Sequence, residues 1–184
     1  LIKLSSGDIT FAQLLVAAAR TKKDIIISTG ASTLAEVHSA VELIESTWSE
    51  LGHDGNLAVL HCISAYPASV ESLNLRAIST LSNALPGVVV GYSDHALGIE
   101  AALAAVAVGA RIVEKHFTLE KNYSSYRDHQ LSANPTELAK LRERIDQLEL
   151  MLGTGTKEPD AVETEMRTAI RRSISARRDL PVGH

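Results

Sequence analysis

The sequence predicts an α/β fold, a (β/α)8 TIM barrel, of which this chain holds strands four to eight. Short apolar runs recur along the chain with segments of helical length between them, which is typical of parallel strands joined by helices. Five such units are present, whereas a whole barrel takes roughly 250 residues, so we expect the other strands upstream. Polar residues end all five strands. An open doubly wound sheet, the alternative fold, needs them mostly at one switch point.

The first three units have clear start and stop signals. A helix is predicted over Ile9–Arg20 with Asp8 as its cap, and Thr33 and Glu36 have capping-box spacing for the next helix. Pro86 follows the third helix and stops it. The strands of these units are predicted over Leu1–Leu4, Asp24–Ile27 and Leu57–Leu60.

The last two strands are predicted over Val88–Val90 and Arg111–Val113, with the alanine-rich helix Gly98–Gly109 between them. A polar irregular loop then covers Lys121–Ser132. Asn134 and Pro135 have the residue types of an N-cap and a first helical position, so they predict the start of a long helix. Its expected buried stripe is Leu138, Leu141, Ile145, Leu148 and Leu152.

Composition limits the class of protein. The chain has 184 residues, of which 45% are hydrophobic but only 4% aromatic, so the core must be aliphatic. A net charge of -4 with mixed signs excludes a nucleic-acid footprint, and no apolar run is long enough to cross a membrane. The single cysteine, Cys62, permits no internal disulfide. We therefore expect a cytoplasmic protein.

Two histidines and a carboxylate follow neighbouring strands. Strand alternation puts Ser93 and His95 on one face, and Glu114 and His116 on one face, so these groups can converge beyond the carboxyl ends of the strands. Two imidazoles suit a divalent transition metal and leave positions for substrate and water. For each histidine alone, a hydrogen bond at a strand end is the alternative. His38 and His53 are expected at the surface, and His61 in the core.

A lysine on an apolar strand indicates an anion site. Lys3 faces a barrel interior, where its charge is costly unless it meets an anion. Small hydroxyl donors end three other strands, and a cation among hydroxyls suits a phosphate. These donors are Ser6, Ser28 and Ser93. Lys3 could instead form a Schiff base. Lys115 is turned away from the site by strand alternation.

The chain is divided into residues 1–153, the C-terminal part of a catalytic barrel, and residues 154–184, a final helix and linker.

The loop Tyr126–His129 concentrates polar groups after the last strand. It is interpreted as closing over a sugar, with a solvated surface loop as the alternative.

The strand-end motifs together resemble the sialic acid synthase (N-acetylneuraminate synthase) family, over nearly the whole chain. The two histidine motifs are highly specific, and the serine motifs become so in combination. The basic segment Arg171–Asp179 resembles the link in that family to a C-terminal antifreeze-like domain. The motifs are Lys3–Gly7, Ser28–Gly30, Leu60–Cys62 with Tyr66–Pro67, Gly91–His95 and Glu114–Thr118.

The resemblance implies a homodimeric synthase that condenses phosphoenolpyruvate with an N-acyl amino sugar and releases phosphate by C–O cleavage. His95 and His116 would hold Mn²⁺ or Mg²⁺, and Glu114 would handle protons near the metal-bound water. Lys3, Ser6, Ser28 and Ser93 would bind phosphoenolpyruvate. Ser64, Tyr66 and Asp128 would line the phosphoenolpyruvate and sugar pocket.

Two departures leave the sugar open. Many family members carry a Pro-Gly-Pro-Asp run where this chain has Ser124–Arg127 before Asp128, and some have Asn where Ser64 stands. The sugar could be N-acetylmannosamine or a diacetamido precursor of legionaminic- or pseudaminic-type acids. A class I aldolase using Lys3, or a non-catalytic sugar-phosphate binding protein, are the alternative functions.

Overall fold

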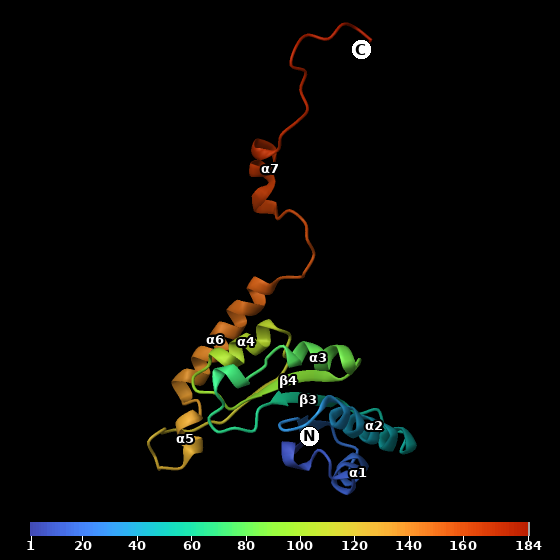
Figure 1. Ribbon diagram of the computed structural model, residues 1–184, viewed down its shortest axis with the longest axis vertical. Helices are drawn as coiled ribbons and strands as arrows, with labels where there is room; N and C mark the ends of the chain where they lie inside the picture. Colours follow the sequence, from blue (N-terminus) through green and yellow to red (C-terminus); the bar gives the residue numbers. More distant parts are fainter. Residues whose placement is uncertain (184) are drawn as a thin grey trace. The chain divides into compact units, whose positions relative to one another are not determined.

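The computed structural model describes residues 1–183, in two compact units that divide between Met151 and Leu152. The first unit contains one parallel sheet whose five strands are in chain order (Figure 1). All five predicted strands are present, and the second to the fifth extend past their predicted ends toward the predicted site. Their bounds are β1 Ile2–Leu4, β2 Ile25–Ser28, β3 Leu57–Cys62, β4 Val89–Asp94 and β5 Val113–Lys115.

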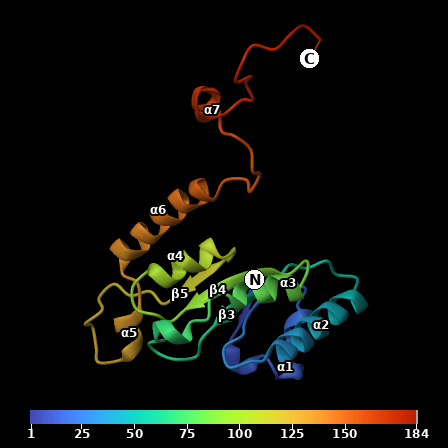
Figure 2. The same ribbon diagram turned by 45° about the horizontal axis from the view of Figure 1, so that its top comes forward.

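Each strand is joined to the next by a helical connection. Right-handed crossovers taken always in the same direction place these helices on one face of the sheet. After β5 the chain forms α5 and then α6, which lies beside α4 (Figures 1 and 2). The helices are α1 Ala12–Arg20, α2 Leu34–Glu50, α3 Ala77–Ala84, α4 Glu100–Ala107, α5 Arg127–Leu131 and α6 Pro135–Leu152, with 3-10 turns η1 Ser6–Asp8 and η2 Val70–Ser72.

The sheet curls like half of a barrel. Lys3 on β1 and Glu114 on β5 belong to opposite edges, yet Lys3 Nζ lies 3.5 Å from Glu114 Oε2. Four strand spacings in a flat sheet would separate those edges by roughly 19 Å. The strand order also has no reversal point. The open doubly wound alternative is therefore wrong, while closure by three further strands stays a prediction.

An aliphatic core fills the space between the sheet and its helices. Ile25 and Ile27 on β2 and Val59 on β3 have no exposed surface. Trp48 on α2 joins them, and its indole Nε1 donates to the carbonyl of Ala19 at 3.1 Å. The composition-based prediction of an aliphatic core is confirmed.

Local sequence signals placed two helix starts correctly and a third wrongly. The capping box of Thr33 and Glu36 begins α2. Asn134 Oδ1 accepts from the Glu137 backbone N–H at 2.9 Å and begins α6. By contrast, α1 begins after Phe11, because Asp8 ends the turn η1 and its carboxylate accepts from the Ser5 hydroxyl.

Three further expectations are corrected. The buried stripe of α6 reduces to Leu141, which is 3% exposed, whereas Leu138 is 44% and Leu152 50% exposed. The reason is that α6 packs on α4 through a small cluster. The polar loop contains the short helix α5. His53 is half-buried, with its ring edge-on to Trp48 at a centroid distance of 5.6 Å.

The second unit contains η3 Ala161–Glu163 and α7 Thr164–Ile170, which begin at a capping box of Asp160 and Glu163. Residue 184, the last of the predicted linker, lies outside the described residues. In the part of the chain that the structure describes, no helix is both long and apolar enough to cross a membrane.

Candidate active site

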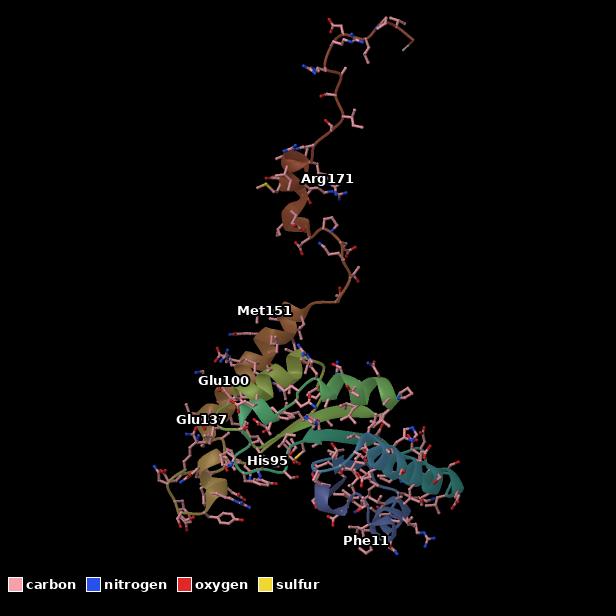
Figure 3. The ribbon with its side chains drawn as sticks, in the orientation of Figure 1. Phe11, His95, Glu100, Glu137, Met151 and Arg171 are labelled. Atoms are coloured by element: carbon pink, nitrogen blue, oxygen red, sulfur yellow. The ribbon has the colours of Figure 1, made fainter. Side chains whose placement is uncertain are left out.

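The two predicted metal ligands lie together at the carboxyl ends of β4 and β5. These strands pair in register through Asp94 and Lys115, so the next residues, His95 and His116, leave the sheet side by side (Figure 3 labels His95). The centroids of their rings are 5.3 Å apart and the ring planes meet at 68°. The predicted convergence of the two imidazoles is confirmed.

A backbone hydrogen bond fixes the tautomer of His95. Its Nδ1 lies 2.8 Å from the carbonyl oxygen of Ile63. A carbonyl only accepts, so Nδ1 carries the proton and the lone pair of neutral His95 is on Nε2. Metal-binding histidines typically donate the N–H of the ring nitrogen that does not bind the metal to a backbone carbonyl or a carboxylate, as His95 Nδ1 does here.

Cys62 is in contact with the same ring nitrogen. Its buried Sγ lies 3.7 Å from His95 Nδ1. Burial lowers the pKa of His95, but hydrogen bonds to Cys62 and Ile63 raise that pKa overall. Burial raises the pKa of the Cys62 thiol, but His95 and the Ser6 and Ser93 hydroxyls lower it overall. The contact between these two groups therefore raises the pKa of His95 and lowers that of Cys62.

Tyr66 packs against both histidines. Its ring centroid is 4.1 Å from that of His95 and 5.9 Å from that of His116. The guanidinium carbon of Arg127 lies 5.1 Å from the centroid of the Tyr66 ring. Burial first, and then the charges of Cys62, Asp128 and Glu114, raise the pKa of Tyr66 against the opposing effect of Arg127. The Tyr66 phenol is therefore uncharged, and its ring lines one side of the site.

A hydrogen-bonded chain joins the predicted anion-binding residues to the predicted proton-handling group. Lys3 Nζ donates to Ser28 Oγ at 2.8 Å and lies 3.5 Å from Glu114 Oε2. Ser93 Oγ donates to Glu114 Oε1 at 2.7 Å. The Lys3 ammonium is thus paired with the Glu114 carboxylate, and it also donates to the carbonyl of Leu4 at 3.2 Å.

Ser6 and Ser64 come close together over a glycine at the end of β2. The backbone N–H of Gly30 donates to Ser6 Oγ at 2.9 Å. A Cβ on Gly30 would lie 2.2 Å from Ser64 Oγ, 2.9 Å from Ser6 Oγ and 3.3 Å from Cys62 Sγ. Only a residue without a side chain leaves room for both hydroxyls.

We expect Gly30→Ala to destabilise the complete protein by about 1–3 kcal/mol, because the added methyl group overpacks this cluster. The measurement is the free energy of unfolding in urea. Gly7→Ala is the matched control, since a Cβ there meets nothing within 4 Å. Equal stabilities of the two variants would contradict the crowding argument.

The loop residue Asp128 faces His116. Asp128 Oδ2 lies 3.9 Å from His116 Nδ1, which is within ion-pair range but too long for a hydrogen bond. Asp128 Oδ1 lies 3.9 Å from Arg127 Nε. The helix α5 therefore carries one acidic and one basic group to the mouth of the site.

The donor set fits a partly coordinated divalent metal. Among residues 1–183 no three His, Cys, Asp or Glu side chains are placed to share one ion. Two neighbouring imidazoles, one with its Nε2 lone pair fixed by the Ile63 carbonyl, leave the other positions to substrate and water. That arrangement is open, as in catalytic rather than structural sites.

The structure brings all ten predicted site residues into one contact network. The sequence reasoning did not single out Cys62 or Gly30 as site residues, and it placed Arg127 only in the loop predicted to close over a sugar. Cys62 lies within β3, two residues beyond the predicted end of that strand, and pairs with Ser93. Lys115 is turned away as predicted, toward Asp94.

Comparisons with known proteins identify relatives of this chain. Residues 1–157 match the NeuB family. An uncharacterized protein of Methanocaldococcus jannaschii is 44% identical over 98% of this chain and 52% of its own length. The N,N'-diacetyllegionaminic acid synthase of Legionella pneumophila is 41% identical over 99% of this chain and 50% of its own length.

A crystal structure gives the same result for the fold. The structure is that of N-acetylneuraminic acid (sialic acid) synthetase from Leptospira borgpetersenii serovar Hardjo-bovis in complex with citrate. It superposes on this chain with a TM-score of 0.83 at 38% sequence identity. The match covers 94% of this chain and 59% of that one. The chain spans about half the length of the curated relatives it matches.

Proposed function

The chain belongs to the NeuB family, and we propose that the complete protein condenses phosphoenolpyruvate with an N-acyl amino sugar to give a 2-keto sugar acid and phosphate. The observation that carries this proposal is one continuous network: Lys3 contacts Glu114, Glu114 contacts Ser93, and Cys62 links Ser93 to His95. The residues proposed to bind an anion are thereby connected to the two imidazoles proposed to bind a metal ion.

The proposed reaction forms one C–C bond and breaks one C–O bond. The methylene carbon of phosphoenolpyruvate attacks the aldehyde carbon of the sugar, and the aldehyde oxygen takes a proton to become a hydroxyl. Water adds to the cation left at C2 and loses a proton. The resulting tetrahedral carbon expels phosphate by C–O cleavage, and the remaining hydroxyl loses its proton to give the ketone.

The residues of the network have distinct parts in this proposal. Lys3 and Ser28 bind phosphoenolpyruvate through charge-assisted and neutral hydrogen bonds. The Ser6 and Ser93 hydroxyls add polar contacts from neighbouring strand ends. Glu114 accepts the proton of the water that adds at C2.

The sugar is placed over Tyr66, with Ser64 and Asp128 as its polar contacts. The Tyr66 ring provides an apolar surface beside the two histidines. His95 and His116 would hold Mn²⁺ or Mg²⁺. When bound, such an ion supplies Lewis-acid polarisation of the aldehyde oxygen.

The test is phosphate release from phosphoenolpyruvate by the complete protein, assayed with a panel of N-acyl amino sugars. Phosphoenolpyruvate labelled with ¹⁸O in the bridging C–O–P position makes the test specific. C–O cleavage delivers the label to phosphate, whereas P–O cleavage leaves it in the keto acid. Unlabelled phosphate, or no release with any sugar, would refute the proposal.

We expect Asp128→Ala to weaken sugar binding, with an apparent KM for the sugar raised by roughly 5- to 150-fold and little change for phosphoenolpyruvate. The physical reason is the loss of a charged acceptor for sugar hydroxyls, which contributes about 1–3 kcal/mol. Asp146→Ala on α6 is the control, because Asp146 forms an exposed ion pair with Arg142. Unchanged kinetics for every sugar would mean that this loop is solvated surface.

A further inference from the structure

A buried ion pair joins the two strand ends that carry the histidines. Lys115 Nζ lies 2.8 Å from Asp94 Oδ2, and the side chains of Lys115 and Asp94 are 3% and 0% exposed. Asp94 directly precedes His95, and Lys115 directly precedes His116. The two residues are also register partners in the β4–β5 ladder. The pair therefore connects the strands at the last position before each imidazole.

The same groups hold the backbone on both sides of His95. Lys115 Nζ donates a second hydrogen bond to the carbonyl of Ala96 at 2.8 Å. Asp94 Oδ1 accepts from the backbone N–H of Ala96 at 2.9 Å and from the Tyr92 hydroxyl at 3.3 Å. His95 is thus flanked by two residues that are both bonded to Lys115.

We infer that Asp94, Lys115 and Tyr92 are positioning residues that set the separation of His95 and His116 for metal binding. This inference rests on the proposed function, because it assumes that the two imidazoles bind one ion. We call the three residues the strand-end clamp. The bonds of these side chains go to one another and to the backbone of Ala96, so the clamp acts through the backbone beside His95.

Two physical arguments favour a positioning role over simple stabilisation. Replacing a buried ion pair by well-packed apolar residues is often neutral for stability, so the pair needs another reason to be there. Metal coordination supplies one, since ligand distances must hold to within about 0.2 Å. Two histidines on separate strands meet that tolerance only if the strand ends are locked together.

The decisive experiment measures Mn²⁺ affinity of the complete protein from the electron paramagnetic resonance signal of the free ion. The double variant Asp94→Asn/Lys115→Met removes both charges and leaves neither unpaired. We expect it to bind Mn²⁺ about 10- to 100-fold more weakly, as is usual when groups that orient metal ligands are lost. Near-UV circular dichroism checks its fold, and Arg142→Met, which breaks an exposed ion pair, is the matched control.

A milder variant covers the case in which the double variant does not fold. Tyr92→Phe removes one of the hydrogen bonds to Asp94, and we expect Mn²⁺ affinity to fall by about two- to tenfold. If the double variant folds and binds Mn²⁺ with wild-type affinity, the inference about the clamp is wrong. If the double variant does not fold, wild-type Mn²⁺ affinity in a folded Tyr92→Phe variant has the same meaning. A wild-type protein that binds no Mn²⁺ overturns the metal part of the proposed function instead, and the clamp with it.

Discussion

Replacement of His95 or His116 by alanine will reduce turnover of the complete protein by about a thousandfold or more, because bound metal contributes several kcal/mol of charge stabilisation. Mn²⁺ binding will be lost in the same variants. The fold will remain, since both side chains lie at strand ends rather than in the aliphatic core cluster. Phosphate release and Mn²⁺ titration are the measurements.

The matched control for the histidines is His38→Ala. His38 lies on α2, where its ring faces only Glu42 one turn further along the helix. A chelator should abolish turnover of the wild type, and added Mn²⁺ should restore it. Full turnover in chelator or in either single variant would remove the two-histidine metal site from the proposal.

Replacement of Lys3 by alanine will raise the apparent KM for phosphoenolpyruvate by roughly 10- to 150-fold and leave that for the sugar nearly unchanged. A charge-assisted hydrogen bond to an anion contributes about 1.5–3 kcal/mol, which corresponds to that range. The Glu114 carboxylate, which lies 3.5 Å from Lys3 Nζ, will also lose its ammonium partner. Steady-state kinetics with each substrate varied in turn will measure the effect.

Lys3→Arg separates the anion site from the Schiff-base alternative. A guanidinium keeps the positive charge but cannot form a Schiff base, so it should retain part of the affinity if Lys3 binds an anion. Lys23→Ala at an exposed position is the control for loss of charge. Complete inactivity of Lys3→Arg, with borohydride trapping of the wild type with substrate, would support the aldolase.

The sequence alone predicted the elements and the end of the sheet at which polar groups gather. Apolar runs, capping boxes and the Asn134–Pro135 start depend on neighbouring residues, so local patterns were sufficient to find them. The meeting of His95 and His116 was also predictable, because parallel pairing carries the residues after two adjacent strands to one edge.

The tertiary structure decided what depends on distant segments. Which leucine of α6 is buried depends on the surface that packs against the helix, and the cluster shared with α4 contains Leu141. The start of α1 is a local exception, because the Ser5–Asp8 contact in η1 competes with capping by Asp8. The tautomer of His95 is set by the Ile63 carbonyl, which belongs to a different connection.

The contact of Lys3 with Glu114 shows most clearly the difference between what the local sequence predicts and what the tertiary structure decides. Each residue could be placed at a strand end from its own neighbours, but their 3.5 Å separation arises from the curl accumulated over five strands. Strand twist and coiling add up across a sheet and are not encoded at any one position. The sequence therefore determined which groups face the site, and the curvature of the sheet determined which of them meet.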